Sequence, residues 1–379
     1  MNPTLTLFAL AVVVLCSLWL EHNVKVFAKL GAAATAIMVA MVLSNLGVIP
    51  GASPVYDFLM GPLVLAGIVL ILLSVNVRSI RDAGTPMLVA FVIGAVGTGV
   101  GAFAMGIALG SSIGADAWKL SGQFTGTYVG GGMNFVAIGQ ELGTAPDLFS
   151  AGIAADVIIT AVWLVACLVI PEILDRRAGI RSDTSATDAA AADPSSMLAQ
   201  LSSSVNAMTL TDFAGLATIA LGVMWFSDLL AGWLPMVPKV LWLTTLALAL
   251  AQLRFVRRLN GAVVLGHSLL LLFLAGNGAK SVIARIVEVG PAIFYFAAGV
   301  VAIHGIIIFG VGRLLRMNGD LLSIASQANI GGSTTAMALA GARRRPDLIL
   351  PGVAVGMLGS AAGNYAGIAV AFLVRSWGA

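Results

Sequence analysis

Long apolar runs without a charged side chain dominate the chain, and the short segments between them hold most of the lysines and arginines. A helix needs about 20 consecutive apolar residues to cross the hydrocarbon core of a bilayer. Ten runs meet or approach that length and predict ten membrane-spanning helices. The predicted spans cover residues 5–20, 30–49, 59–77, 86–109, 148–171, 212–234, 239–253, 261–279, 290–312 and 348–374.

Two further apolar stretches are interrupted by glycine, asparagine, glutamine and threonine. Backbone that leaves the helical conformation at membrane depth must lie inside protein or against a watery cavity, because lipid satisfies no hydrogen bonds. We therefore expect residues 120–142 and 321–342 to form hairpins that enter and leave on the same side of the membrane.

The placement of basic residues favours these re-entrant hairpins over two extra crossings, since Lys and Arg concentrate in short cytoplasmic loops. With the hairpins re-entrant and the N-terminus outside, fifteen Lys and Arg residues, among them Arg78, Arg81 and Arg181, lie on the cytoplasmic side and five lie outside. If both stretches crossed completely, the two sides would hold ten each.

The two halves of the chain align without a gap at a shift of 200 positions. Five spans separate equivalent positions, so the second half is expected to lie upside down relative to the first. The predicted fold class is an all-α polytopic membrane protein with two inverted repeats of five transmembrane helices, each with a re-entrant Gly-Gly hairpin. We expect a first repeat over 1–171, a cytoplasmic linker over 172–209 and a second repeat over 210–379. The matched pairs are Gly131 with Gly331, Gly132 with Gly332, Pro146 with Pro346, Asp147 with Asp347, Leu148 with Leu348 and Gly152 with Gly352.

Composition excludes several other classes of protein. The chain is 59% hydrophobic and 10% charged, whereas soluble domains carry about a quarter charged residues. Its basic residues form no stripe for nucleic acid, and both cysteines lie in apolar segments, so neither a disulfide nor a transition-metal site is expected. His267 and His304 lie in apolar helices without partner ligands, which favours packed or hydrogen-bonded histidines. No nucleophile or metal motif accompanies them, so we do not expect an enzyme.

The polar and glycine residues of the two hairpins are the candidate binding residues. Glycines let the backbone turn, the freed N–H groups at a half-helix start attract an anionic group, and the freed carbonyls can coordinate a hard cation. The alternative for the hydroxyl residues is a bond back to their own helix. The candidates are Thr127, Gly130, Gly131, Gly132 and Asn134 in the first hairpin, and Gln327, Asn329, Gly331, Gly332, Ser333, Thr334 and Thr335 in the second.

Asp156 is the acid that lies well inside the fifth predicted span. An unpaired carboxylate at that depth is expensive, so Asp156 is a candidate for ion coupling. The alternative is that the helix starts deeper and Asp156 lies near the interface. Asn364, in the last span, is a further candidate for polar contacts with the hairpins.

At these motifs the chain resembles a known family. Residues 125–136 read TGTYVGGGMNFV and residues 326–332 read SQANIGG, and both resemble the YjcL-like bacterial membrane proteins grouped under domain of unknown function 819. The order of segments also resembles the sodium/glutamate symporters and the 2-hydroxycarboxylate transporters, whose two inverted halves each contain a Gly-Gly hairpin.

These observations predict a secondary active transporter that works by alternating access in the bacterial inner membrane. Sodium is expected as the coupling cation, with protons as the alternative, and no other cofactor is expected. The expected solute carries a carboxylate, such as an amino acid, a short peptide or an organic acid. A homodimer is expected, with residues 5–49 and 212–253 as its scaffold. The rivals are a channel or structural membrane subunit and, less favoured, a membrane-embedded enzyme.

Overall fold

The structure is a computed structural model that describes residues 2–76, 83–178 and 208–377. Regular structure in these residues is helical, which confirms the all-α fold class. Arg78, Arg81 and Arg181 and most of the predicted linker lie outside the described residues. The helices are α1 (Pro3–Asn23), α2 (Lys25–Asn45), α3 (Pro54–Phe58), α4 (Val64–Leu72), α5 (Gly84–Ile113), α6 (Ala117–Gly130), α7 (Gly132–Glu141), α8 (Pro146–Ala178), α10 (Leu210–Trp233), α11 (Lys239–Ala251), α12 (Ala262–Lys280), α13 (Ile283–Leu314), α14 (Gly319–Ile330), α15 (Gly332–Ala342) and α16 (Ile349–Trp377), with short helical turns at Leu59–Leu63, Val256–Arg258 and Pro346–Leu348.

Eight helical segments of the described residues are long and apolar enough to cross a membrane. Two more apolar helices, Gly31–Asn45 and Lys239–Ala251, correspond to predicted spans but are shorter. At 1.5 Å per residue, a 13-residue helix such as α11 covers only about 20 Å. The chain is therefore a multi-pass membrane protein in which two of the ten predicted spans are short.

Several span boundaries differ from the prediction for identifiable reasons. In α2, Gly31 has a φ of 77° and kinks the helix. The third predicted span begins earlier, at Pro54, because α3 and α4 are joined by a five-residue π-helical turn that accommodates Pro62. This span ends at Leu72, not at residue 77. α13 begins at Ile283, earlier than residue 290, because Pro291 is accommodated inside the helix.

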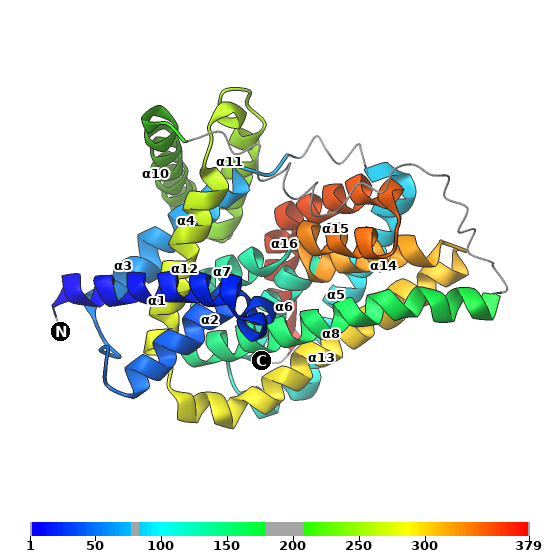
Figure 1. The fold of residues 1–379 in the computed structure, drawn as a ribbon, viewed down its shortest axis with the longest axis horizontal. Helices are drawn as coiled ribbons and strands as arrows, with labels where there is room; N and C mark the ends of the chain where they lie inside the picture. Colours follow the sequence, from blue (N-terminus) through cyan, green and yellow to red (C-terminus); the bar gives the residue numbers. More distant parts are fainter. Residues whose placement is uncertain (1, 77–82, 179–207, 378–379) are drawn as a thin grey trace.

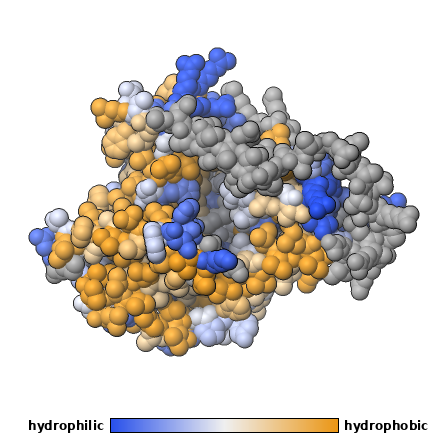
Figure 2. Space-filling view, in the orientation of Figure 1, coloured by the Kyte–Doolittle hydropathy of each residue, from blue (hydrophilic) through white to orange (hydrophobic). Residues whose placement is uncertain are grey.

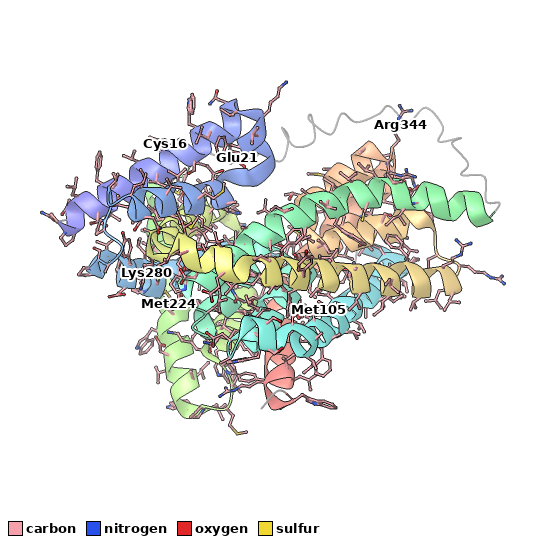
Figure 3. All side chains as sticks on the ribbon, turned by 90° about the horizontal axis from the view of Figure 1, so that it is seen from below. Cys16, Glu21, Met105, Met224, Lys280 and Arg344 are labelled. Atoms are coloured by element: carbon pink, nitrogen blue, oxygen red, sulfur yellow. The ribbon has the colours of Figure 1, made fainter. Side chains whose placement is uncertain are left out.

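The helices form two groups that lie side by side (Figure 1). In the first group α12 packs against α2 and α4, and α10 packs against α11 and α4. In the second group α5 packs against α13, α6 against α16, and α14 against α15 and α8. Figure 3 shows Met105 on α5 in this second group, and its sulfur covers Gly299 of α13. The second group contains all the residues of both predicted hairpins.

Glycines set the closest helix contact in the second group. On α6, Gly122, Gly126 and Gly130 recur at every fourth position, and on α16 Gly359, Gly363 and Gly367 do the same. The two stripes face each other in antiparallel register, so that carbonyl oxygens lie where side chains would otherwise stand. Lipid gives no hydrophobic drive between helices, and small residues instead allow the close backbone approach that holds them together.

Apolar side chains cover much of the face seen in Figure 2, over α1, α2 and α13. Large aromatic residues are among the exposed ones, including Trp19 at 59%, Trp225 at 60% and Trp233 at 75%. A soluble monomer rarely exposes so much contiguous apolar surface, whereas a lipid-facing surface requires it.

Candidate functional site

The first predicted hairpin is a pair of helices that fold back on each other. α6 ends at Gly130, Gly131 takes a φ of 90°, and α7 begins at Gly132. Gln123 of α6 donates to the Phe135 carbonyl of α7 at 3.1 Å and accepts from Thr144 beyond α7 at 2.8 Å. The positive φ explains why glycine stands at the turn, because other residues rarely adopt it.

The second predicted hairpin, α14 with α15, folds back in the same way. Here Gly332 carries the positive φ of 80°, one position later than the repeat alignment with Gly131 implies. At the open end of the pair, Arg343 donates to Asp320 at 2.8 Å and so ties α15 to α14. The open end of the first pair is tied by Lys119, which donates to the Gly143 carbonyl at 3.1 Å.

Both turns rest on one helical turn of α16. Ser360 donates to the Gly130 carbonyl at 3.1 Å, and a methyl group added to Gly356 would lie 2.6 Å from the backbone of Ser333. The turns also approach α5, where Thr98 donates to the Tyr128 carbonyl at 3.0 Å. The structure therefore brings the two predicted Gly-Gly motifs together around α5 and α16.

Buried polar side chains near these turns have no hydrogen-bond partner among the described residues. The Thr127 hydroxyl and both amide atoms of Asn134 and of Gln327 are unpartnered, and these side chains are at most 1% exposed. Thr127 and Gln327 are also equivalent positions of the 200-residue repeat. Because buried polar groups are nearly always bonded in native proteins, such a concentration marks where a ligand, ion or water would bind.

A carboxylate adjoins the first of these groups. Asp156 of α8 lies beside the hydroxyls of Thr127, Tyr128 and Thr160. Only Thr160 meets hydrogen-bond geometry, at 3.4 Å, and the other two hydroxyls remain unpartnered. Three hydroxyl-bearing side chains thus surround one carboxylate, which is the chemistry that a hard cation requires.

The remaining predicted residues lie in different surroundings. Asn329 packs over Gly94 of α5, and with its amide nitrogen turned inward it donates to the carbonyls of Phe91 and Ala325 at 3.2 Å each. Thr335 bonds back to the Gly332 carbonyl at 3.1 Å, which is the alternative that the sequence left open. Thr334 is exposed.

Asn364 faces the other group of helices. It donates to Thr244 of α11 at 2.8 Å, and its oxygen is unpartnered. A cavity of about 300 Å³ between the end of α4, α10 and the start of α12 is lined by none of the predicted site residues.

Sequence reasoning missed Tyr128, which lies on the first hairpin beside Asp156, and also Thr160 and Ser360, which lie close to that hairpin. The repeat held a signal for two of them. Thr160 and Ser360 are equivalent at a shift of 200, and each contacts the region of the first hairpin, one through Asp156 and the other through Gly130. The equivalent of Asp156 is Gly356, so only one half of the repeat carries the acid.

Comparison with known proteins places these features in a family. The family described as "Protein of unknown function (DUF819)" matches residues 8–377. The "Uncharacterized membrane protein YjcL" of Bacillus subtilis is 30% identical over 370 residues, which cover 93% of this chain and 91% of that protein. As the hairpin motifs predicted, the chain belongs to the DUF819 family of membrane proteins.

Proposed function

We propose that the protein is a secondary active transporter, coupled to sodium, that moves a small carboxylate-bearing solute by alternating access. The observation that carries the proposal is the set of buried, unpartnered side chains, Thr127, Asn134 and Gln327, beside two helix breaks that rest on one turn of α16. Interrupted helices at matching positions of a repeat are typical of a transporter's binding site.

The proposed cation site consists of Asp156 and the hydroxyls of Thr127, Tyr128 and Thr160. Hydroxyl and carboxylate oxygens suit sodium, which is a hard cation. A proton taken up by Asp156 is the alternative form of coupling.

The proposed solute site lies at the starts of α7 and α15. The first N–H groups of a helix have no partner within it and carry partial positive charge, which suits a carboxylate. Asn134, Gln327 and Ser333 supply neutral donors beside these helix starts. An amino acid, a short peptide or an organic acid would meet this chemistry.

The proposed cycle moves the hairpin-bearing group of helices against the other group. In this proposal the hairpins are re-entrant, the two halves are inverted repeats, and α1, α2, α10 and α11 form the scaffold of a homodimer in the bacterial inner membrane. The corresponding pairings of α1 with α2 and of α10 with α11 support the repeat.

Uptake by purified protein in proteoliposomes tests the proposal. A panel of radiolabelled amino acids, dipeptides and organic acids is offered under an inward sodium gradient, an inward proton gradient or neither. We expect saturable uptake of at least one solute that requires the sodium gradient. Uptake that is indifferent to both gradients would refute coupling, and flux that does not saturate would indicate a channel.

A further inference from the structure

A buried histidine of α13 links the helices that surround both turns. His304 is fully buried. Its Nδ1 lies 2.8 Å from the Gly94 carbonyl and 2.9 Å from the Thr98 hydroxyl, both on α5. Its Nε2 lies 2.8 Å from the Ser326 hydroxyl on α14. One imidazole therefore joins α13, α5 and the second hairpin.

The partners determine where each hydrogen lies. The Gly94 carbonyl can only accept, so the proton of a neutral imidazole lies on Nδ1. Thr98 then accepts from Nδ1 and donates its own hydrogen to the Tyr128 carbonyl of α6 at 3.0 Å. On the other side, Ser326 accepts from the Trp163 indole at 2.9 Å and donates to Nε2.

The Gly94 carbonyl and the Thr98 hydroxyl share the one hydrogen on Nδ1, and each other hydrogen in this network has a single acceptor. This network of hydrogen bonds runs from the Trp163 indole through the side chains of Ser326, His304 and Thr98. It ends at the Tyr128 carbonyl. Tyr128 O is one of the last carbonyls of α6, which have no partner within the helix, so Thr98 satisfies a group that the break at Gly131 leaves open. The network thus begins on α8, passes through the second hairpin at Ser326 and ends at the first hairpin.

We propose that His304 is a positioning residue that couples the two hairpins, so that loosening one loosens the other. If the second hairpin moves alone, Nε2 loses its donor inside a buried network, and the imidazole that positions Thr98 loses one of its three hydrogen-bond contacts. Alternating access requires that the two halves of the site do not open independently. The proposal rests on the proposed transport cycle for its purpose, but its geometry does not depend on which solute is carried.

Hydrogen exchange of the purified protein in nanodiscs tests the coupling and needs neither solute nor cation. Ser326→Ala removes the hydrogen-bond donor to His304. We expect hydrogen exchange in the first hairpin, residues 117–141, to become about fivefold faster, because the loss of one hydrogen bond has roughly that effect. Ser323→Ala is the matched control, because Ser323 lies on the same helix, is buried and has no partner. It should leave the first hairpin unchanged.

Two further variants separate coupling from a local effect. Trp163→Phe removes the bond to Ser326 but keeps Ser326 bonded to His304, so it should not loosen the first hairpin. In a His304→Phe background the first hairpin should already exchange faster, and adding Ser326→Ala should change it no further. Gel filtration and circular dichroism confirm that each variant is folded, and His304→Gln replaces His304→Phe if the latter is not.

The proposal is overturned if Ser326→Ala acts on the first hairpin no more than Ser323→Ala does, or if its effect persists without His304. Failure of sodium-driven uptake would leave these exchange results unchanged, so it would count against the transport function and not against the coupling.

Discussion

The Asp156 carboxylate lies beside three hydroxyl groups. Two of these hydroxyls have no hydrogen-bond partner among the described residues. Thr127 and Tyr128 lie on the first hairpin, whereas Asp156 and Thr160 lie on α8. A cation bound between them would connect these two elements and would satisfy hydroxyls that the protein itself leaves unpartnered.

Replacing Asp156 with Asn should remove sodium binding, because it keeps the size of the side chain but removes its charge. We expect sodium-dependent thermal stabilisation to disappear and sodium-driven uptake to fall more than about tenfold, as for loss of one charged ligand. Asp57→Asn is the control, since this side chain is 83% exposed and its ion pair with Lys280 is 3.9 Å long. Equal sodium stabilisation of Asp156→Asn and the unsubstituted protein would exclude Asp156 from the cation site.

Gln327 offers a test of the unpartnered groups, because both amide atoms are buried without a partner. Gln327→Met keeps the volume and removes a buried polar group, so it should stabilise the empty protein by about 1–3 kcal/mol while it abolishes uptake. Gln252→Met should have the opposite effect on stability, since the Gln252 amide nitrogen donates to the carbonyls of Val75 and Leu248 and only its oxygen is unpartnered. Thermal unfolding without solute compares the two. A lower melting temperature for Gln327→Met would show that its amide is bonded in the empty protein.

At the scale of elements, the glycine stripes hold the first hairpin against α16 while the base of the second hairpin is held by charge. α6 meets α16 through three glycines on each helix. α14 and α15 are instead joined by Asp320, which accepts from Arg343 and Arg345 at 2.8 and 3.1 Å. The two hairpins therefore have the same shape but different attachments.

Gly130→Ala should destabilise the protein, because the added methyl group would overlap the carbonyl of Gly359, and backbone cannot move aside as a side chain does. Overpacking of this kind costs about 1–3 kcal/mol. Gly110→Ala is the matched control, since no atom lies within 4 Å of the added methyl, and alanine favours the helix by up to about 1 kcal/mol. Thermal unfolding compares the two variants. Equal stability would show that α6 and α16 are not in close contact.

Arg343→Gln should loosen the second hairpin, because it removes the bond to Asp320 and the bond to the Leu168 carbonyl of α8. We expect faster hydrogen exchange in residues 319–342 and a loss of about 1–3 kcal/mol. The neighbouring Arg344 points away from the bundle (Figure 3), so Arg344→Gln should change stability by less than about 0.5 kcal/mol. If the two variants behave alike, the Asp320 network does not hold the hairpin.

At the scale of the whole molecule, the predicted charge asymmetry implies that the two turns approach the midplane from opposite sides. The turns lie together at one level of α16, so their sidedness depends on how the bundle is oriented in the membrane. Labelling from each side of the membrane can measure this orientation.

Single cysteines at the equivalent positions Met133 and Ser333 provide that measurement, because both side chains are partly exposed beside their turns. Met133→Cys should react with a membrane-impermeant thiol reagent faster from outside, and Ser333→Cys faster from the cytoplasm, since the charge rule places the first hairpin outside. Both variants need a background in which Cys16 and Cys167 are replaced by alanine. The reverse sidedness would contradict the predicted orientation.

The sequence by itself determined the helical fold, the positions of the interrupted helices and the family, because apolar run length and glycine placement are local properties of the chain. The sequence also identified Thr127, Asn134 and Gln327 as candidate binding residues. Only the tertiary structure decided that the two turns share one turn of α16, that Asn364 faces α11, and that His304 connects the hairpins. These contacts join residues as much as 230 positions apart, and which partner a buried polar group finds depends on how the helices pack, which no local pattern records.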